Sequence, residues 1–296
     1  MVELRREPIL MECAGWDAYR LLDSGAGRKY ETFGPYAFIR PEPQALWQPR
    51  LPQWPAAGEF IPGSDEDGGG RWVLKQELPE MGWELGWKAV RFSAQPTPFR
   101  HLQFFPDMAP VWDWMGEQLV GRTDAQTMNL FGYTGLGSLS LSEFGPVTHV
   151  DASKKSVAQA RANAVLSGME DRAIRWLVDD AAKFTAREVR REKRYDGIIL
   201  DPPKFGRGPK NETWRLEEGL PALIGDCARL LDAGSRFLFL TVYAVRMSSI
   251  AIAGLLHEAL RELPGIIEHG DLTVREDGEA GRLLPTAIFA RWSNPR

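Results

Sequence analysis

Residues 126–290 alternate between short apolar runs and longer amphipathic stretches, and this alternation limits the fold more than any other feature. The apolar runs predict seven strands, at residues 127–131, 146–151, 174–178, 195–200, 236–242, 266–272 and 285–290. The stretches between them predict helices, at residues 138–144, 153–166, 181–193, 214–231 and 250–263. Such a pattern is typical of a doubly wound α/β sheet that is mostly parallel. The last two strands have no helix between them, so we expect an antiparallel hairpin at one edge.

The N-terminal third follows a different pattern. Short apolar pieces alternate there with Gly and Pro turn signals, which predicts strands joined by hairpin loops. We therefore expect a smaller β-rich domain at residues 1–95 and the α/β domain at residues 96–296. We expect the tryptophans of the first domain to pack in its core and on strand faces, and stacking on a single-stranded base is the alternative. They are Trp16, Trp47, Trp54, Trp72, Trp83 and Trp87.

Composition excludes several classes of protein. The hydrophobic share is 44% and the charged share 26%, which is typical of a globular domain, and no apolar run is long enough to span a bilayer. Residues 1–10 are charged and lack the apolar stretch of a signal peptide. Cys13 and Cys227 are the only cysteines, so we expect neither a disulfide framework nor a zinc site, and a cytoplasmic location. A net charge of −4 gives no general attraction to nucleic acid, although a local basic surface stays open.

A glycine-rich turn follows the first strand of the α/β part. Gly132, Gly135 and Gly137 stand between that strand and the next helix, where a backbone can approach a ligand closely. Asp151 ends the next strand, about 20 residues on, where an acid can accept hydrogen bonds from ribose hydroxyls. The spacing is neither that of a dinucleotide fingerprint nor that of a phosphate loop. For the glycines alone, tight packing is the simpler explanation, but acids that also end the next strands, such as Asp180, favour a nucleoside-containing cofactor.

A second signature lies after the fourth strand, at Asp201-Pro202-Pro203-Lys204-Phe205-Gly206. Two successive prolines cannot continue a strand, so the chain must leave the sheet at Asp201. An acid, a cation and an aromatic residue then stand at the carboxyl edge of the sheet, where open α/β sheets bind ligands. The alternative is a polar loop whose prolines only end the strand.

These motifs resemble those of class I S-adenosylmethionine-dependent methyltransferases. The resemblance rests on Asn129-Leu130-Phe131-Gly132-Tyr133-Thr134-Gly135, Asp151, Asp179-Asp180-Ala181 and Asp201-Pro202-Pro203-Lys204-Phe205, and covers roughly residues 96–292. It is strongest toward the bacterial branch that methylates large-subunit ribosomal RNA and carries Asp-Pro-Pro-Lys-Phe. It implies a Rossmann-like seven-stranded fold, S-adenosylmethionine as cofactor and S-adenosylhomocysteine as product. It also implies an RNA partner, and it needs neither a metal nor a membrane.

The resemblance assigns roles residue by residue. Cofactor contacts are implied for His101, Phe105, Asn129, Phe131, Gly132, Tyr133, Thr134, Gly135, Asp151, Ala152, Asp179, Asp180 and Ala181. Within this set, Asp151 would hold the ribose, and Asp180 or Asp179 the adenine amino group. Asp201 and the carbonyl of Pro202 would face the acceptor, and Phe205 would stack on the target base. Substrate contacts are expected from Lys204, Arg207, Lys210 and Tyr243. For the three basic residues a solvated loop is the alternative.

The acceptor atom follows from the cysteines. Methyl transfer to a pyrimidine C5 requires a cysteine that first adds to the ring. The cytosine-C5 members of the branch carry one after the fifth strand, where this chain has none between Thr241 and Arg246. We therefore expect a nitrogen acceptor rather than cysteine-assisted C5 methylation, unless Cys13 reaches the site. A ribose 2′-hydroxyl ranks lower.

Two other functions stay open on the sequence alone. One keeps the methyltransferase but changes the acceptor to a protein side chain or a small molecule, and the acidic net charge and the lack of a recognisable RNA-binding module keep it open. The other is a cofactor-binding protein without catalysis, whose Trp-rich part binds a partner. The sequence does not name the oligomeric state.

Overall fold

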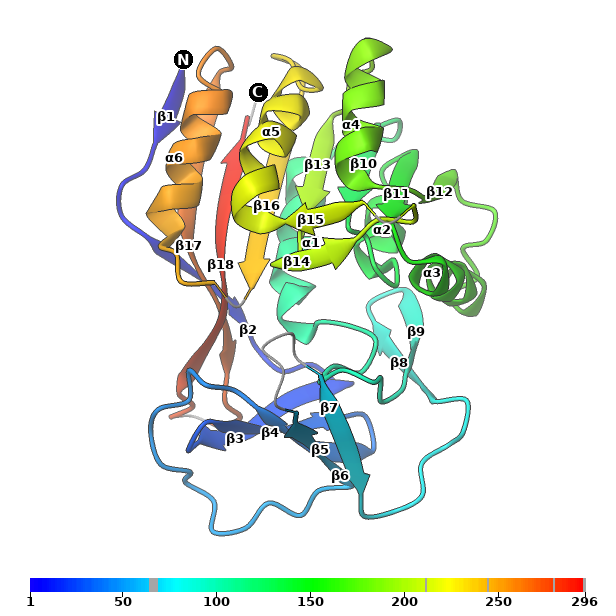
Figure 1. The fold of residues 1–296 in the computed structure, drawn as a ribbon, viewed down its shortest axis with the longest axis vertical. Helices are drawn as coiled ribbons and strands as arrows, with labels where there is room; N and C mark the ends of the chain where they lie inside the picture. The colour runs from blue at the N-terminus through cyan, green and yellow to red at the C-terminus, as the bar shows by residue number, and fades with distance from the viewer. Residues whose placement is uncertain (64–68, 211, 244, 279, 295–296) are drawn as a thin grey trace. The chain divides into compact units, whose positions relative to one another are not determined.

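The computed structural model describes residues 1–63, 69–210, 212–243, 245–278 and 280–294 (Figure 1). By its contacts the chain forms two compact units, and each is described here by itself. The first contains Met1–Met11, Val111–Asp271 and Ala287–Arg296, and the second contains Glu12–Pro110 and Leu272–Thr286. These units follow contacts rather than one cut in the chain, and the domains predicted at residues 1–95 and 96–296 stay a prediction.

The first unit is built on a mostly parallel sheet, which confirms the predicted α/β class. Within the described residues, nine strands join in the order β1-β17-β18-β16-β13-β10-β11-β12, and β2 also pairs with β17. β16, β13, β10, β11 and β12 are parallel neighbours, whereas β18 is antiparallel to β16. The strands are β1 (Val2–Leu4), β2 (Ile9–Cys13), β10 (Thr127–Leu130), β11 (Val147–Asp151), β12 (Ile174–Val178), β13 (Gly197–Leu200), β16 (Phe237–Tyr243), β17 (Gly265–Arg275) and β18 (Leu283–Ser293).

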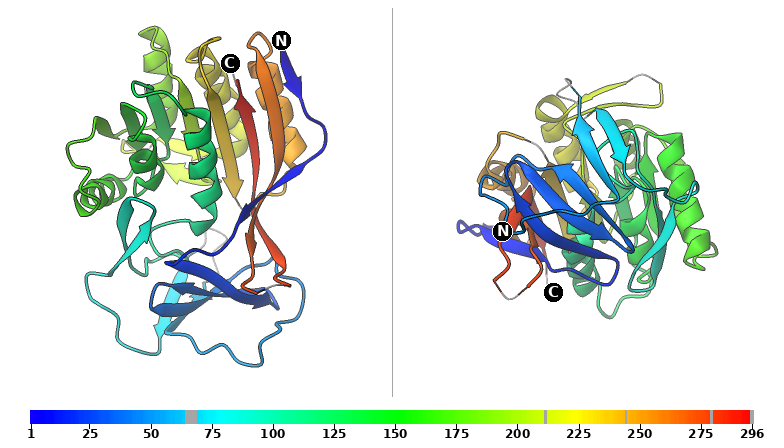
Figure 2. Two further views of the ribbon diagram at one scale, coloured as in Figure 1. Left: turned by 180° about the vertical axis from the view of Figure 1, so that it is seen from behind. Right: turned by 90° about the horizontal axis from the view of Figure 1, so that it is seen from below.

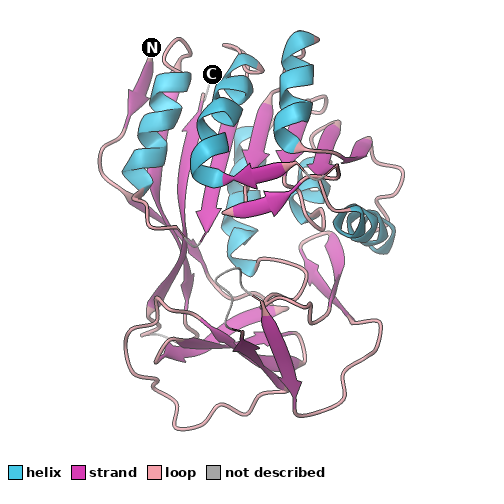
Figure 3. Ribbon diagram, viewed as in Figure 1, coloured by secondary structure: helices cyan, strands magenta, loops and turns pink. Residues whose placement is uncertain are grey.

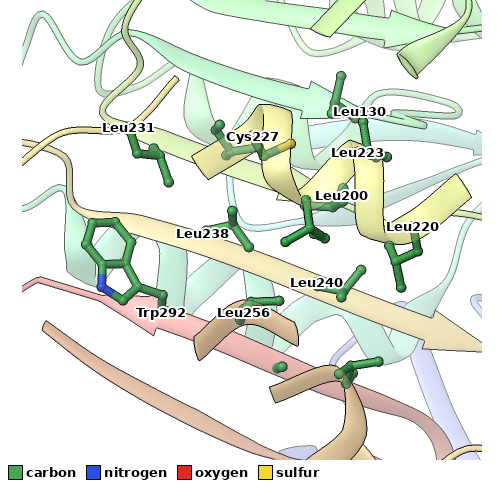
Figure 4. Close-up of a cluster of buried hydrophobic side chains, with 14 of the residues drawn as sticks. Leu130, Leu200, Leu220, Leu223, Cys227, Leu231, Leu238, Leu240, Leu256 and Trp292 are labelled. Carbon is green, nitrogen blue, oxygen red and sulfur yellow. The ribbon is translucent and has the colours of Figure 1, made fainter. Parts of the chain in front are cut away.

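Helices cover both faces of this sheet, as the doubly wound pattern requires (Figures 1 and 2). Alternate residues of β16 point to opposite faces. Leu238 and Leu240 belong to the core beneath α5 and α6 (Figure 4). Phe237 and Phe239 instead contact Trp114 of α1, with ring centroids 5.7 and 5.3 Å apart. The helices are α1 (Ala109–Gln118), α2 (Leu136–Leu141), α3 (Lys154–Leu166), α4 (Ala181–Arg190), α5 (Leu216–Arg229) and α6 (Ser249–Ala259).

Two local predictions need correction. Trp214 does not begin a helix, because residues after the double proline form a small antiparallel hairpin of β14 (Phe205–Arg207) and β15 (Thr213–Arg215). The indole of Trp214 donates to the carbonyl of Pro203 (2.7 Å), which holds the extended backbone before α5 begins. The predicted C-terminal hairpin is also not the edge of the sheet, since β1 pairs with β17 in parallel. A charged N-terminal segment of three residues gives no strand signal by itself.

The second unit is β-rich, as predicted (Figure 3). Its five-stranded sheet has the order β3-β4-β5-β6-β7, antiparallel except for β5 and β6, and β8 pairs with β9. The strands are β3 (Tyr19–Gly25), β4 (Arg28–Phe33), β5 (Tyr36–Pro41), β6 (Gly58–Pro62), β7 (Gly70–Leu74), β8 (Trp83–Trp87) and β9 (Val90–Ala94). A 3-10 turn, η1 (Pro106–Met108), precedes α1.

The tryptophans of the second unit pack as predicted. Trp83 and Trp87 are buried, and the others are half-buried. Trp54 stacks on Tyr30 with centroids 5.7 Å apart, and its indole donates to Asp23 (2.9 Å). The indole of Trp72 donates to the carbonyl of Thr97 (2.8 Å). Indoles tied in this way serve the fold of the unit.

Candidate cofactor and substrate site

Strand register brings the predicted site residues of the first unit to one edge. Leu130 at the end of β10 pairs with Val150 of β11 and with Leu200 of β13. Because these strands are parallel, the residues that follow them leave the sheet side by side. Phe131 and Asp201 therefore lie at the same carboxyl edge as Asp151.

The turn after β10 has an unusual backbone. Phe131 and Tyr133 have positive φ angles, 57° and 48°, which side-chain-bearing residues rarely adopt. A Cβ on Gly132 would lie 2.5 Å from the ring of His149, and one on Gly135 would lie 2.7 Å from the Cβ of Ala160. Both glycines therefore make room for the protein's own side chains. This agrees with tight packing as the explanation for the two glycines. The backbone strain at this edge therefore lies at Phe131 and Tyr133.

Asp151 fixes this turn from the next strand. Its carboxylate accepts hydrogen bonds from the backbone N–H of Tyr133 (2.9 Å) and of Ser153 (2.8 Å). Burial raises the pKa of Asp151, and these two bonds act against that rise. An ionised carboxylate offers about four lone-pair positions, so two bonds leave acceptor capacity for a ligand.

A buried polar chain supports the turn from behind. Asn129 Nδ2 donates to Ser138 Oγ (3.0 Å), and Ser138 Oγ is 2.9 Å from His149 Nδ1. Burial lowers the pKa of His149 to about 3, so its ring is neutral at pH 7. Asn163 of α3 donates to the carbonyl of Thr134 (3.0 Å). Asn129 is thus buried and bonded beneath the turn, and Thr134 is buried within it. The sequence indicated neither Ser138 nor His149 as part of the site.

Acids also follow β12, next to Asp151. One oxygen of Asp179 accepts the backbone N–H of Asp180 (2.9 Å), and the other pairs with Arg187. Asp180 is the N-cap of α4, where one oxygen accepts the N–H of Lys183 (2.8 Å). Ala181 begins this helix and is buried. Ala152 is half-buried after Asp151.

The Asp201 loop presents its residues at the same edge. Asp201 is half-buried, and its N–H points to the carbonyl of Leu130 (3.5 Å). Pro202 is buried, whereas Phe205 is 42% exposed. Tyr243 ends β16, the strand next to β13, and is half-buried.

Basic residues stand close to Phe205 in the chain. Lys204, Arg207 and Lys210 are exposed, and their contact with a substrate stays a prediction. The structure adds Arg215, whose guanidinium lies 5.8 Å from the centre of the Phe205 ring. The sequence did not indicate Arg215, because a predicted helix from residue 214 hid its cross-strand position. Among the described residues, no group of three or more His, Cys, Asp or Glu side chains could hold a metal ion.

His101 and Phe105 belong to the second unit. Their rings are 5.3 Å apart, and burial lowers the pKa of His101 to about 4. Their part in cofactor binding stays a prediction.

Comparison with known proteins decides the family. No protein-family model matches the chain. A solved structure of a SAM-dependent methyltransferase from Agrobacterium tumefaciens has a TM-score of 0.93 and 38% identity, covering 100% of this chain and 96% of that one. The chain belongs to the S-adenosylmethionine-dependent methyltransferases.

Curated relatives of this methyltransferase match shorter stretches. Ribosomal RNA large subunit methyltransferase I of Alteromonas mediterranea is 34% identical over 84 residues, which are 28% of this chain and 21% of the relative. Ribosomal RNA large subunit methyltransferase K/L of Shewanella pealeana is 29% identical over 128 residues, or 42% of this chain and 17% of the relative. The matches span about a fifth of the length of these relatives.

The carboxylates at this sheet edge fit the hydrogen-bond donors of S-adenosylmethionine. Asp151 retains acceptor capacity for two ribose hydroxyls. Among the residues that the structure describes, one oxygen of Asp180 accepts a hydrogen bond, whereas both oxygens of Asp179 are engaged. The fit therefore favours Asp180 over Asp179 for the adenine amino group.

Proposed function

We propose that this protein transfers a methyl group from S-adenosylmethionine to a base of ribosomal RNA. The observation that carries the proposal is the Asp201 loop, whose acid and exposed aromatic residue stand at the sheet edge that also holds Asp151. The names of the two curated relatives support large-subunit ribosomal RNA as the acceptor. A cytoplasmic location goes with this acceptor.

The cofactor supplies a methyl group that is already activated on a sulfonium. The work of the chain is therefore to bind, to align and to exclude water. Asp151 holds the ribose, Asp180 the adenine amino group, and the turn at residues 131–135 lies against the methionine part.

Asp201 orients the acceptor. An amine nucleophile must aim its lone pair at the methyl group, so its hydrogens need acceptors on the opposite side. The carboxylate of Asp201 and the carbonyl of Pro202 provide them, and Phe205 stacks on the target base. No strong general base is needed, because the nitrogen attacks with a lone pair that it already has. The proton that the methylated nitrogen then releases passes to Asp201 or to water.

A nitrogen acceptor is favoured over carbon C5 by the state of both thiols. Cys227 belongs to α5, its side chain is fully buried in the core, and burial raises its pKa. Cys13 is buried in the second unit, where its Sγ donates to the carbonyl of Pro106 (3.2 Å), and burial raises its pKa as well. The nucleophilic form of cysteine is the thiolate, and a raised pKa suppresses it.

Transfer of labelled methyl to total RNA from cells that lack this protein tests the proposal. We expect the wild type to label one RNA species. Asp201→Ala should lower the rate about 100-fold, as removal of one oriented hydrogen-bonding group does in other active sites. Its affinity for S-adenosylmethionine should stay within about twofold of the wild type, since the residues that hold the cofactor are unchanged.

Asp171→Ala is the matched control, because Asp171 is exposed in a turn of the same unit. It should keep the wild-type rate. If the wild type binds S-adenosylmethionine but labels no RNA, the acceptor is wrong, and protein extract and metabolite pools are tested in the same assay. If Asp201→Ala transfers methyl as fast as the wild type, the role of Asp201 is wrong.

A further inference from the structure

The β14–β15 hairpin has two chemically different faces. Phe205 pairs with Arg215 and Arg207 pairs with Thr213 across the two antiparallel strands. Directly opposed residues share a face, as do residues two apart along a strand. All four therefore lie on one face, and all four are exposed. The middle pair of the hairpin, Gly206 and Trp214, lies on the opposite face.

The opposite face anchors the hairpin to the first unit. Trp214 is 7% exposed and donates its indole N–H to the carbonyl of Pro203 (2.7 Å). Its ring lies 5.2 Å from that of Phe131, which opens the turn after β10. A Cβ on Gly219 of α5 would meet the Trp214 ring at 2.6 Å, so the indole is tightly enclosed. A hairpin held in this way can present its outer face without folding on binding.

The far end of the hairpin is tied as well. Glu212 accepts the ammonium of Lys183 on α4 (2.8 Å) and the backbone N–H of Lys210 (2.8 Å). The N–H of Gly208 donates to the carbonyl of Glu212 (2.8 Å). Bonds to Lys183 and Lys210 lower the pKa of Glu212 to about 2, so it is ionised at pH 7. Glu212 therefore belongs to the support, and the outer face carries positive charge only.

The outer face combines a ring with cations. The guanidinium of Arg215 lies over the Phe205 ring at 5.8 Å, within the range of a cation–π contact. Its nearest acid is Glu218 at 3.9 Å, and since both are largely exposed this pair is weak. Among the described residues, Arg207 has no ion-pair partner within 4.0 Å. Phe205 is thus covered by a cation on one side of its ring.

We propose that this face, made of Phe205, Arg207, Thr213 and Arg215, binds the unpaired RNA strand on both sides of the target base. The base stacks on the ring of Phe205 opposite Arg215, and the two guanidinium groups hold the flanking phosphates. Arg215 is then a substrate-binding residue. Single-stranded rather than duplex RNA is the ligand, because stacking on a side chain requires a base that has left its own stack. This inference rests on the proposed RNA acceptor.

Fluorescence anisotropy with a labelled oligoadenylate of about 12 nucleotides tests the surface. We expect Arg215→Ala to bind this oligonucleotide about tenfold more weakly than the wild type does. The negative slope of log K against log salt should become shallower by about 0.7, the value for one phosphate contact on a single strand. Arg215→Lys should keep the slope yet bind about threefold more weakly, since an ammonium lacks the planar guanidinium. The duplex with oligouridylate should bind the wild type more weakly than the single strand does.

Arg229→Ala is the matched control. Arg229 is an exposed arginine of α5 outside the hairpin, with 67% of its side chain accessible. It should leave binding and slope unchanged, and all variants should keep the wild-type affinity for S-adenosylmethionine. Wild-type values for Arg215→Ala, or equal binding of single strand and duplex, would overturn the inference. The two proposals fail in different ways. If the proposed function is wrong, the wild type labels no RNA. If only this inference is wrong, the wild type labels RNA and Arg215→Ala has the same KM for RNA as the wild type.

Discussion

At the scale of single residues, the carboxylate of Asp151 has two tasks. It accepts hydrogen bonds from the backbone N–H groups of Tyr133 and Ser153, and in the proposed function its remaining acceptor capacity serves the ribose. The turn that it holds contains two residues in the left-handed region, Phe131 and Tyr133. Each such residue costs about 1–3 kcal/mol, so the turn needs a fixed partner to keep its shape. Asp151 therefore shapes the turn, and in the proposed function it also binds the ribose of the cofactor.

Replacement of Asp151 tests these tasks together. We expect Asp151→Ala to weaken S-adenosylhomocysteine binding about 100-fold, because the ribose loses an acceptor and the turn loses its support. Isothermal titration calorimetry measures the change. Ser153→Ala removes the helix cap that Ser156 uses but keeps the carboxylate. It should cost about 1 kcal/mol of stability and change affinity little. Equal losses in both variants would mean that Asp151 acts only through local stability.

At the scale of elements, β3, β4 and β5 are joined by a buried ion pair. Glu31 is fully buried between the guanidinium of Arg40 (2.7 Å) and the hydroxyl of Tyr19 (2.7 Å), with Lys29 at 3.7 Å. Burial acts to raise the pKa of Glu31, but Arg40 and Lys29 outweigh it and lower the pKa to about 2. The three strands therefore share a charge that must stay ionised.

The stability of the second unit should fall in acid. A folded pKa below the unfolded value of 4.5 means that the contribution of Glu31 is complete above pH 4.5 and is lost as the pH falls toward 2. Glu31→Gln leaves the buried Arg40 without its bonded counter-charge, so we expect a loss of about 3–5 kcal/mol at pH 7 and a weaker pH dependence below 4.5. Urea unfolding followed by tryptophan fluorescence at several pH values measures the loss of stability and its pH dependence.

A surface pair provides the control for this prediction. Glu59 pairs with the exposed Arg28 at 3.3 Å. Glu59→Gln should cost about 1 kcal/mol or less, because water screens the pair. A pH dependence in Glu31→Gln that equals that of the wild type would show that other groups govern the acid transition.

At the scale of the whole molecule, the two ends of the sequence meet in one sheet. β1 pairs with β17, with Val2 opposite Gly265, so the first strand of the chain completes the edge next to the C-terminal strands (Figure 1). Val2 is 7% exposed and belongs to the main core. Within the described residues, no helix is long and apolar enough to cross a bilayer.

A charge at residue 2 should therefore unfold the edge. We expect Val2→Asp to lower the free energy of unfolding by about 2–4 kcal/mol, because a carboxylate replaces a buried side chain without a partner. Glu3 points outward, with 58% of its side chain exposed, and Glu3→Gln should change stability by less than about 0.5 kcal/mol. Thermal unfolding of the two variants measures these changes. An unfolding temperature of Val2→Asp equal to that of the wild type would show that β1 adds no stability.

Much of the fold was predictable from local pattern. The hydrophobic periodicity and the turn residues predicted the strands and helices of the α/β part. Val157, Ala160 and Ala164, for example, lie on the buried face of α3. Ser153 was predictable as its N-cap. The edge that holds Asp151 and Asp201 followed from the parallel order of the strands.

The sequence by itself determined the α/β class, the methyltransferase motifs and the sheet edge at which they gather, because these depend on residues close together in the chain. Only the tertiary structure decided the rest. Val2 reaches β17 across more than 260 residues, and Arg215 lies over Phe205 only through the register of a hairpin that Trp214 anchors. His149 lies under Gly132 because neighbouring strands are in register. Contacts between distant residues leave no periodic trace in the sequence, since they arise from how elements pack rather than from how each one forms.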